Sequence, residues 1–416
     1  MHLKTRNVNT AFRELVTLFT GKIRTDVRYT GNVPAEIQCI DPVIAKRPSR
    51  NGNVLVIDEP VTVTYTHPKE RVLFNAARDA NPFFHLYEAL WMLAGRNDVA
   101  PLAYYNKRMA EFSDNGETFN GAYGYRWRKA TVAHSEDKRV KRYAYCESGW
   151  VDQLDLLVAH LKADPTSRRA VLQMWNVEDD LLKVGGPEFV CKWCGKGRPD
   201  GEAVLCRCGG EFSVNLNKAS KDVCCNMSVM FSLRGDKNPT YDADGEPLPS
   251  LDMTVTNRSN DLIWGCLGGD YVTFSVLQEY VAVRLGCEVG LYHHFTNNLH
   301  VYDWNWKPEE WLSEPTYTQE AGRYGNGTPL FPLTKDPGVF ERELRNFAGA
   351  FSGEEDPWQC VHEWQEPFLM DVAAPLLSAF RQHKQGERKW AMEWAEKIKA
   401  DDWRIAATRW LERRKK

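Results

Sequence analysis

Two close pairs of cysteines interrupt the middle of the chain, Cys191 with Cys194 and Cys206 with Cys208. The surrounding segment, residues 181–221, is rich in Gly and Lys, while the segments on either side have the apolar patterns of one continuous core. The chain must therefore fold as a core that closes around an insertion. Four thiolates at this spacing can close a tetrahedral zinc site, so we expect structural Zn²⁺, with a loop of reduced thiols as the alternative.

Composition limits the class of protein and its compartment. Eleven cysteines in 416 residues are too scattered for an extracellular disulfide framework, and a formal net charge of -3 argues against a dedicated nucleic-acid binder. The chain has no run of about eighteen apolar residues, and residues 1–4 lack the apolar core of a signal peptide. We therefore expect a soluble cytoplasmic protein with no membrane segment and a small anionic ligand.

Apolar periodicity predicts a mixed α/β fold. Residues 61–64, 229–233 and 251–255 have strand patterns, whereas residues 82–95 and 272–285 have helical ones. After residue 305 the chain becomes rich in Trp and Pro and then helical. The predicted division is a catalytic domain at 1–180 and 222–305, a zinc-ribbon-like insertion at 181–221, and a helical C-terminal extension at 306–416.

The residues 257–261, Asn-Arg-Ser-Asn-Asp, are the most informative for chemistry, and a Gly-rich segment that ends at Asp270 follows them. Arg258 can bind phosphate through two hydrogen bonds, and a carboxylate in a dry Gly-rich turn can contact the polar edge of a pyrimidine. Cys224 and Cys225 precede a predicted strand, and a thiol there can act as a nucleophile if nearby arginines and a base lower its pKa. Glu88 lies inside an apolar helical pattern. Together these residues indicate a nucleotide site.

Their order along the chain resembles that of the thymidylate synthase family. The matching stretches are residues 49–52, 88–95, 121–128, 167–169, 175–176, 258–261 and 299–302. The resemblance covers roughly residues 50–302 and implies the thymidylate synthase fold, a mixed β-sheet flanked by helices. The cysteine-rich insertion and the C-terminal extension depart from the family pattern.

The resemblance also implies roles for single residues. A thiolate would attack C6 of the pyrimidine, and the register before Phe231 favours Cys225 as that thiol, with Cys224 as the second choice. Glu88 matches a glutamate that organises water and proton transfer, and Tyr123 matches a residue that supports the folate and the water network. The residues that match nucleotide or water-network ligands are Arg50, Arg258, Ser259, Asn260, Asp261, His300 and Tyr302. The one-carbon donor would be 5,10-methylenetetrahydrofolate.

Further matches and departures concern assembly and product. Arg168 and Arg169 match a pair that the family lends across a dimer interface, which implies a homodimer. Asp270 replaces an Asn, and a carboxyl group suits cytosine, so this region looks most like the phage deoxycytidylate hydroxymethylase branch. Asn226 replaces a His, and Met109 lies near the position of a Trp that shields the intermediate, so we expect hydride transfer to be lost.

These features predict 5-hydroxymethylation of dCMP with methylenetetrahydrofolate and water, in the host cytoplasm if a phage encodes the chain. The enzyme alternatives are a reductive dCMP 5-methyltransferase and then a thymidylate synthase that converts dUMP to dTMP. An alternative from another class is a zinc-ribbon scaffold that binds nucleic acid or a protein partner. Product mass, and competition between dCMP and dUMP, distinguish these functions.

Overall fold

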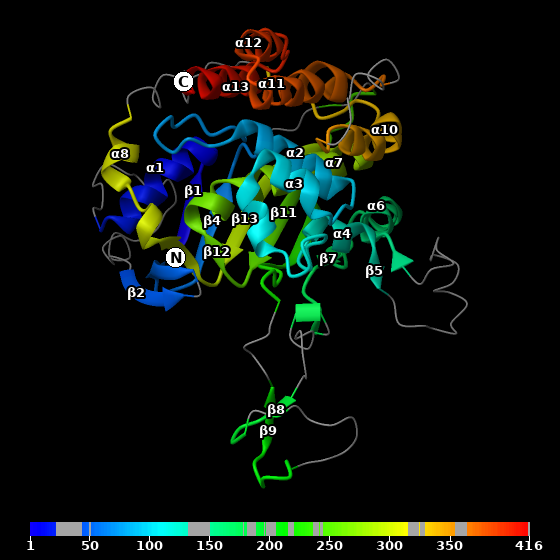
Figure 1. Ribbon diagram of the computed structural model, residues 1–416. Helices are drawn as coiled ribbons and strands as arrows, with labels where there is room; N and C mark the ends of the chain where they lie inside the picture. The colour runs from blue at the N-terminus through cyan, green and yellow to red at the C-terminus, as the bar shows by residue number, and fades with distance from the viewer. Residues whose placement is uncertain are drawn as a thin grey trace.

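The protein folds as helices packed around two main β-sheets, as its computed structural model shows (Figure 1). All structural statements concern the described residues, which are 1–21, 44–49, 51–131, 150–177, 179–180, 189–194, 196, 205–214, 220–235, 241, 244–314, 324, 329–353 and 364–414. The predicted phosphate ligand Arg50 lies outside them. No helix in these ranges has the length and apolar character needed to cross a bilayer.

A six-stranded mixed sheet forms the centre of the molecule. In spatial order its strands are β1 (His2–Thr5), β4 (Val61–Tyr65), β13 (Glu288–Thr296), β11 (Ser250–Asn257), β10 (Asn226–Arg234) and β7 (Val171–Gln173). The pairs β1–β4 and β13–β11 are parallel, and the other neighbours are antiparallel. The sheet confirms the predicted mixed α/β class and the strands predicted at 61–64, 229–233 and 251–255.

Side chains on this sheet alternate between a buried face and a more accessible one. Phe231, Val255 and Tyr292 point into the core and are at most 3% exposed. On the other face Met230 and Val171 are 38% and 40% exposed, although both are apolar. Because exposed apolar side chains on a sheet face favour contact with another surface, this face can serve in assembly.

Helix α7 (Gly269–Leu285) packs on the sheet, α2 (Pro82–Leu93) packs on α7, and both buried helices carry acidic residues. Helix α2 begins after Asn81, which caps it, and α7 contacts β11 and β13 of the sheet. The prediction for α7 was three residues too short, so Asp270 lies in the first helical turn rather than in a Gly-rich loop. A Cβ at Gly269 would lie 2.4 Å from Oε2 of Glu88, so glycine is required for this close approach of α7 to α2.

A smaller four-stranded sheet lies beside the first. Its strands, in order, are β12 (Asn260–Asp261), β14 (Leu299–Tyr302), β3 (Gly52–Ile57) and β2 (Ile44–Ser49). The further helices are α1 (Val8–Phe19), α3 (Val99–Tyr105), η2 (Lys107–Phe112), α4 (Tyr123–Arg128), α6 (Gln153–Ala163), η5 (Leu262–Cys266), η6 (Asp303–Asn305) and α8 (Pro308–Leu312). A two-stranded ribbon is formed by β5 (Ala130–Thr131) and β6 (Trp150–Val151).

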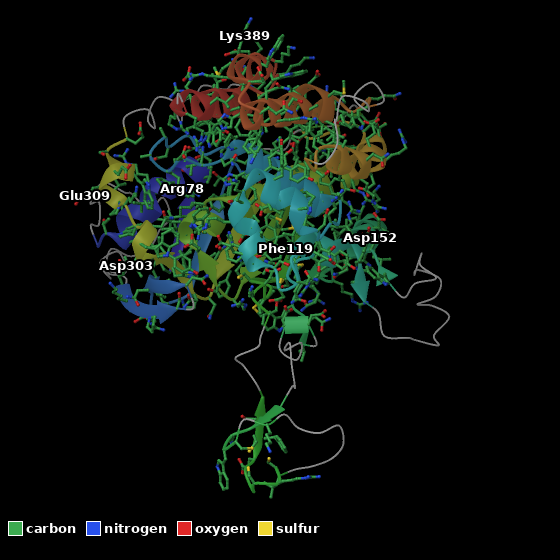
Figure 2. All side chains as sticks on the ribbon, viewed as in Figure 1. Arg78, Phe119, Asp152, Asp303, Glu309 and Lys389 are labelled. Atoms are coloured by element: carbon green, nitrogen blue, oxygen red, sulfur yellow. The ribbon has the colours of Figure 1, made fainter. Side chains whose placement is uncertain are left out.

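The C-terminal helices extend the hydrophobic core. They are α10 (Pro337–Ala350), η9 (Leu369–Ala373), α11 (Ala374–Lys384), α12 (Arg388–Glu396) and α13 (Asp401–Arg413). The ring of Phe83 on α2 lies 5.2 Å from those of Phe380 on α11 and Trp410 on α13. These helices therefore pack on α2, the helix that carries Glu88. Lys389 marks their outer side in Figure 2.

The insertion contains a short antiparallel ribbon, β8 (Phe189–Cys191) paired with β9 (Phe212–Val214). Figure 1 shows this ribbon apart from both main sheets, at the opposite end of the molecule from α12. The core strands β7 and β10 on either side of it in sequence pair directly with each other. The cysteine-rich segment therefore lies, in sequence, between two paired strands of the large sheet, while its bounds as a separate insertion stay a prediction.

Candidate active site

Cys225 lies just before β10, beside Arg258 at the end of β11. Nη2 of Arg258 is 3.7 Å from Sγ of half-buried Cys225. The same guanidinium donates from Nε to the Cys224 carbonyl at 2.9 Å and from Nη2 to the Val223 carbonyl at 3.0 Å. Arg258 is therefore fixed against the cysteine loop, and a cation beside a thiol favours the reactive thiolate.

The neighbouring thiol has a different environment. Cys224 is 1% exposed, and its Sγ donates to the carbonyl of Asn226 at 3.0 Å. Burial raises the pKa of the Cys224 thiol well above its usual value. Since a nucleophilic cysteine has to be accessible and readily ionised, this geometry favours Cys225 as the nucleophile.

Asp270 lies in the first turn of α7 and receives two side-chain amides. Nδ2 of Asn260 and Nδ2 of Asn257 donate to its Oδ2 at 3.1 and 3.3 Å. Burial raises the pKa of Asp270 to about 6, and the two amide hydrogen bonds oppose that rise. Asp270 is therefore a neutral carboxylic acid below about pH 6 and a carboxylate above it.

Glu88 faces the same region from α2. Burial raises its pKa to about 8, and the negative charge of Asp270 adds to the rise. A carboxyl group with such a pKa is protonated at neutral pH and can act as a general acid, or as a base after it transfers its proton. Perturbed carboxyl groups of this kind gather at functional sites more often than elsewhere.

Tyr123 links these groups from the start of α4. Its ring stacks on Phe274 of α7, with the ring centroids 5.8 Å apart. Burial raises the pKa of Tyr123 well above its usual value, and the charges of Asp270 and Cys225 add to the rise. Its hydroxyl therefore keeps its proton and can donate a hydrogen bond in the space between α2, α7 and the cysteine loop.

The parallel pairing of β12 with β14 places two further predicted groups together. Oγ of Ser259 lies 3.4 Å from Nδ1 of His300, and the rings of His300 and Tyr302 are 5.6 Å apart. Asp261 instead accepts the backbone N–H groups of Ile263 and Trp264 at 2.8 and 2.6 Å. This bonding makes Asp261 the cap of η5, a structural role that the sequence did not show.

Among the described residues, Arg168 and Arg169 do not reach this cluster within their own chain. Arg168 and Arg169 are exposed and precede β7, at the edge of the large sheet. Within one chain the structure therefore brings five predicted site residues together: Cys225, Arg258, Asp270, Glu88 and Tyr123. It does not bring Arg168 and Arg169 to them.

A group of Trp and Arg side chains near η5 was missed by the sequence analysis. The guanidinium of Arg108 lies 5.3 Å from the ring centroid of Trp264 and 5.2 Å from that of Trp304. Arg78 is 5.5 Å from Trp264 and donates to the carbonyl of Ile263 at 2.8 Å. Trp264 and Trp304 are 39% and 52% exposed, so flat aromatic faces and cations meet beside the predicted nucleotide ligands. No local pattern could reveal them, because four separate segments contribute.

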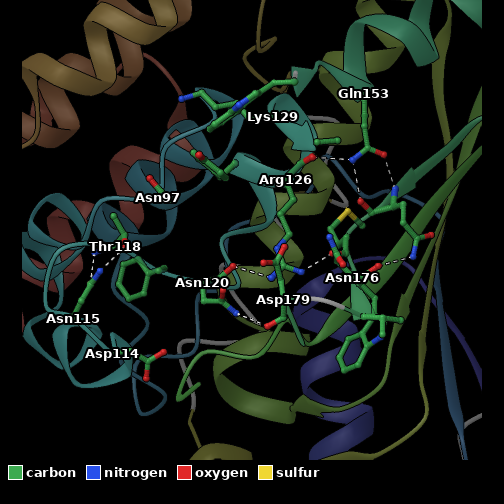
Figure 3. Close-up of a pocket in the computed structure, with 18 residues that line it drawn as sticks. Asn97, Asp114, Asn115, Thr118, Asn120, Arg126, Lys129, Gln153, Asn176 and Asp179 are labelled. Atoms are coloured by element: carbon green, nitrogen blue, oxygen red, sulfur yellow. Dashed lines mark hydrogen bonds between the residues drawn. The ribbon is translucent and has the colours of Figure 1, made fainter. Parts of the chain in front are cut away.

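A cavity of about 840 Å³ is lined in part by Arg126 (Figure 3). Asn120, Asn176 and Asp179 are among its lining groups, and Arg126 donates to the carbonyls of Asn120 and Met174 at 2.8 and 2.6 Å. Its lining residues include none of the predicted catalytic groups. We therefore do not place the reaction there.

The four clustered cysteines of the insertion converge as predicted. All four sulfurs lie within 4.8 Å of one another, with Cys191 and Cys208 at 3.4 Å and Cys194 and Cys206 at 3.6 Å. Sulfurs around a tetrahedral zinc ion with bonds of about 2.3 Å are roughly 3.8 Å apart, so the arrangement fits zinc. A Cβ at Gly210 would lie 2.6 Å from Sγ of Cys191, so only glycine leaves room for this sulfur.

Comparison with known proteins identifies the family. Residues 76–317 match the family described as thymidylate synthase, and the chain belongs to that family. A deoxyuridylate hydroxymethyltransferase of Pseudomonas phage M6 is 35% identical over 381 residues, which cover 89% of this chain and 88% of that protein.

Two further relatives cover less of the chain. A deoxyuridylate hydroxymethyltransferase of Bacillus phage SP01 is 35% identical over 58% of this chain and 49% of that protein. A thymidylate synthase of Symbiobacterium thermophilum is 28% identical over 52% of this chain and 57% of that protein. The family prediction is confirmed, but the named phage relatives act on deoxyuridylate, so the predicted deoxycytidylate branch is not supported.

Proposed function

We propose that this protein is an enzyme that hydroxymethylates C5 of deoxyuridylate, with methylenetetrahydrofolate as the one-carbon donor and water as the source of the hydroxyl oxygen. The observation that carries the proposal is the contact between Cys225 and Arg258, in a chain that covers 88% of a relative named as a deoxyuridylate hydroxymethyltransferase. The carboxyl group of Glu88, whose pKa is raised, is the proton-transfer group that the reaction needs.

Nucleotide binding begins with Arg258 and Ser259, which contact the phosphate, while His300 and Tyr302 contact the sugar hydroxyl. Sγ of Cys225 then attacks C6 of the pyrimidine and makes C5 a carbon nucleophile. Arg258 favours the thiolate by its charge, and its bonds to the loop carbonyls keep the sulfur in place. Arg50 adds to the phosphate ligands in this proposal.

Methylenetetrahydrofolate supplies the one-carbon unit, which becomes bonded to C5. Removal of the C5 proton and departure of tetrahydrofolate leave an exocyclic methylene. Water adds to that carbon, and expulsion of the Cys225 thiolate releases the hydroxymethyl product. Glu88 is the group that holds water and transfers protons in this sequence, because its carboxyl group is neutral when the substrates bind.

Uracil replaces cytosine as the proposed base because the phage relatives are named for deoxyuridylate, and the chemistry of Asp270 allows either base. A neutral carboxylic acid offers one donor and one acceptor, and the proton can sit on either oxygen. Asp270 can therefore pair with uracil or with cytosine, and its presence alone does not select cytosine as the sequence interpretation assumed. Because Asp270 can also pair with cytosine, hydroxymethylation of deoxycytidylate stays the second candidate function.

Folate binding is proposed at the Trp and Arg group beside η5. Trp264 and Trp304 offer exposed faces to the aromatic parts of the donor, and Arg108 lies between them. Arg78 and Arg108 are cations that suit the glutamate carboxylates of a folate. Tyr123 faces the reacting end.

A homodimer is proposed across the accessible face of the six-stranded sheet. Met230 and Val171 expose apolar surface there, and Arg168 and Arg169 lie at the same edge. A symmetric pairing of this face would bring each arginine pair toward the phosphate site of the partner.

The test is mass spectrometry of products formed from dUMP or dCMP with methylenetetrahydrofolate in heavy-oxygen water. A hydroxymethyl product from dUMP that carries solvent oxygen supports the proposal. A methyl product with dihydrofolate would show that hydride transfer occurs and would overturn it. Turnover confined to dCMP would restore the second candidate.

A further inference from the structure

A chain of buried amides connects the cysteine loop to Asp270. Asn226, which follows Cys225, donates from Nδ2 to Oδ1 of Asn257 at 2.7 Å. Asn257 in turn donates from Nδ2 to Oδ2 of Asp270 at 3.3 Å. Both asparagines are 0% exposed. Because Oδ1 of Asn257 is held as an acceptor, its amide can present only N–H groups to Asp270.

A second chain reaches Asp270 from β13. The hydroxyl of Tyr292 lies 3.1 Å from Nδ1 of His294, and Nε2 of His294 lies 3.2 Å from Nδ2 of Asn260. Nδ2 of Asn260 also donates to Oδ2 of Asp270 at 3.1 Å. An amide nitrogen has only donors, so Nε2 of His294 accepts and Nδ1 carries the ring proton. Burial lowers the pKa of His294 to about 3 and keeps the ring neutral.

Both chains end on the same oxygen of Asp270. Two N–H donors occupy the acceptor directions of Oδ2 and stabilise negative charge on it. When Asp270 is protonated, the proton therefore resides on Oδ1. Oδ1 is then the oxygen of Asp270 that remains for a base, and its O–H group would donate a hydrogen bond to that base.

Gly265 keeps the second chain in place. A Cβ at this position would lie 1.8 Å from Oδ1 of Asn260 and 3.1 Å from Oδ2 of Asp270. Any side chain at residue 265 would therefore displace the amide of Asn260 from the carboxyl group. Glycine at this point of η5 is a requirement of the polar network and not only of the helix.

We propose that Asn257 and Asn260 select the pyrimidine by holding Oδ2 of Asp270 as an acceptor, which leaves Oδ1–H to donate to O4 of uracil. Cytosine has an amine at this position, and a donor facing a donor disfavours binding. Asn226 and His294 are positioning residues, because they act on the substrate only through the two asparagines. The proposal rests on the proposed function, since it assumes that Asp270 faces the base.

The experiment compares kcat/KM for dUMP and for dCMP in the full-length protein at about pH 5.5, where Asp270 is protonated, and binding of both nucleotides is also measured by calorimetry. Asn260→Ala removes the donor, His294→Phe removes the group that orients it, and His294→Gln keeps a polar partner. Asn9→Ala is the matched control, because Asn9 is also buried but bonds to Val72 and Phe74. It reports the general cost of deleting a buried amide.

We expect Asn260→Ala and His294→Phe to lower the ratio of dUMP to dCMP kcat/KM by about tenfold or more. His294→Gln should keep most of the ratio, and Asn9→Ala all of it. Folded Asn260→Ala protein with an unchanged ratio would overturn the proposal. If the wild type prefers dCMP, the proposed function fails. A ratio that changes in the variants would even then assign base selection to this network. A wild type that prefers dCMP together with unchanged ratios in the variants would overturn both the proposed function and the role of the network.

Discussion

Nη2 of Arg258 lies 3.7 Å from Sγ of Cys225, while its other bonds hold the carbonyls of Val223 and Cys224. One guanidinium thus fixes the loop of the nucleophile and supplies the charge that favours a thiolate. Because the same cation is proposed to bind the nucleotide phosphate, substrate binding and sulfur activation depend on one residue.

The two adjacent cysteines are expected to respond differently to substitution. Cys225→Ser should lower turnover by roughly 1,000-fold or more, because a serine hydroxyl at this site has no base that makes it a comparable nucleophile. Cys224→Ser should stay within about tenfold of the wild type, since Cys224 is buried and bonds to the Asn226 carbonyl. Steady-state turnover of both purified variants checks this. Loss of activity in the Cys224 variant alone would reverse the assignment.

Glu88 should control both activity and the pH dependence of stability. Glu88→Gln cannot transfer a proton and should lower kcat by roughly 100-fold or more. It should also remove the loss of activity that we expect of the wild type above about pH 8. The pKa of Glu88 is raised in the folded protein, so its contribution to the free energy of unfolding is complete at low pH and is lost as pH rises from the ordinary carboxyl value toward 8.

Thermal unfolding tests the same residue independently of activity. The melting temperature of Glu88→Gln relative to the wild type should increase between about pH 5 and about pH 8, because only the wild type retains a carboxyl group that ionises more readily when unfolded. Glu117→Gln, at an exposed position, is the matched control and should show no such trend. Parallel pH curves for Glu88→Gln and the wild type would contradict the raised pKa.

Base preference should depend on pH through Asp270. Below its pKa of about 6 the group is a donor that suits O4 of uracil, and above it the carboxylate accepts from the amine of cytosine. The titratable groups around it are Glu88, Tyr123, Asp261, Cys266, Tyr292 and His294. The dUMP to dCMP ratio of kcat/KM should therefore fall as pH rises through about 6.

An amide at this position removes the ionisation. Asp270→Asn should favour dUMP at every pH and should give a ratio that no longer changes, because a carboxamide has a fixed donor and a fixed acceptor. The measurement is the pair of kcat/KM profiles for wild type and variant. A wild-type ratio that is flat with pH would remove Asp270 from base selection.

The sequence predicted the parts of this protein that depend on local pattern. The apolar run with Asn81 and Pro82 at its start predicted α2, and the spacing from Phe231 favoured Cys225. The start of α7 was misplaced because Gly268 and Gly269 resemble a turn, whereas close packing against Glu88 and Trp264 is what requires them. Helix packing over long sequence separation overrides local propensity here.

Other features could not follow from one sequence. His294 lies 34 positions from Asn260, and only the sheet brings their side chains to 3.2 Å. Arg108 meets Trp264 and Trp304 from a third segment. The base preference could not be fixed from the sequence, since a carboxylic acid pairs with either pyrimidine until its neighbours fix the proton. The division into three domains stays a prediction.

The cysteine cluster is expected to bind one zinc ion per chain without taking part in catalysis. Four sulfurs within 4.8 Å close the coordination shell, and no position is left for a substrate. Cys194→Ser should lose most of the zinc found by atomic absorption and should make the insertion more sensitive to protease, with turnover within about threefold of the wild type. Cys287→Ser, a change at a half-buried cysteine of the core, is the control and should retain the zinc. Lost turnover in a folded, zinc-free protein would contradict a structural role.

Subunit mixing tests whether Arg168 and Arg169 complete the site of a partner. The double variant Arg168→Ala/Arg169→Ala and the variant Cys225→Ser should each be nearly inactive. In a mixed dimer one site would combine an intact Cys225 with an intact arginine pair from the other subunit. Random mixing should therefore restore about a quarter of the wild-type activity, because half of the dimers are mixed and each has one complete site. Cys225→Ser mixed with Glu88→Gln is the control: both residues belong to one subunit's site, so no activity should return. Equal absence of activity in the two mixtures, with dimers confirmed by light scattering, would mean that the arginines act within their own chain or not at all.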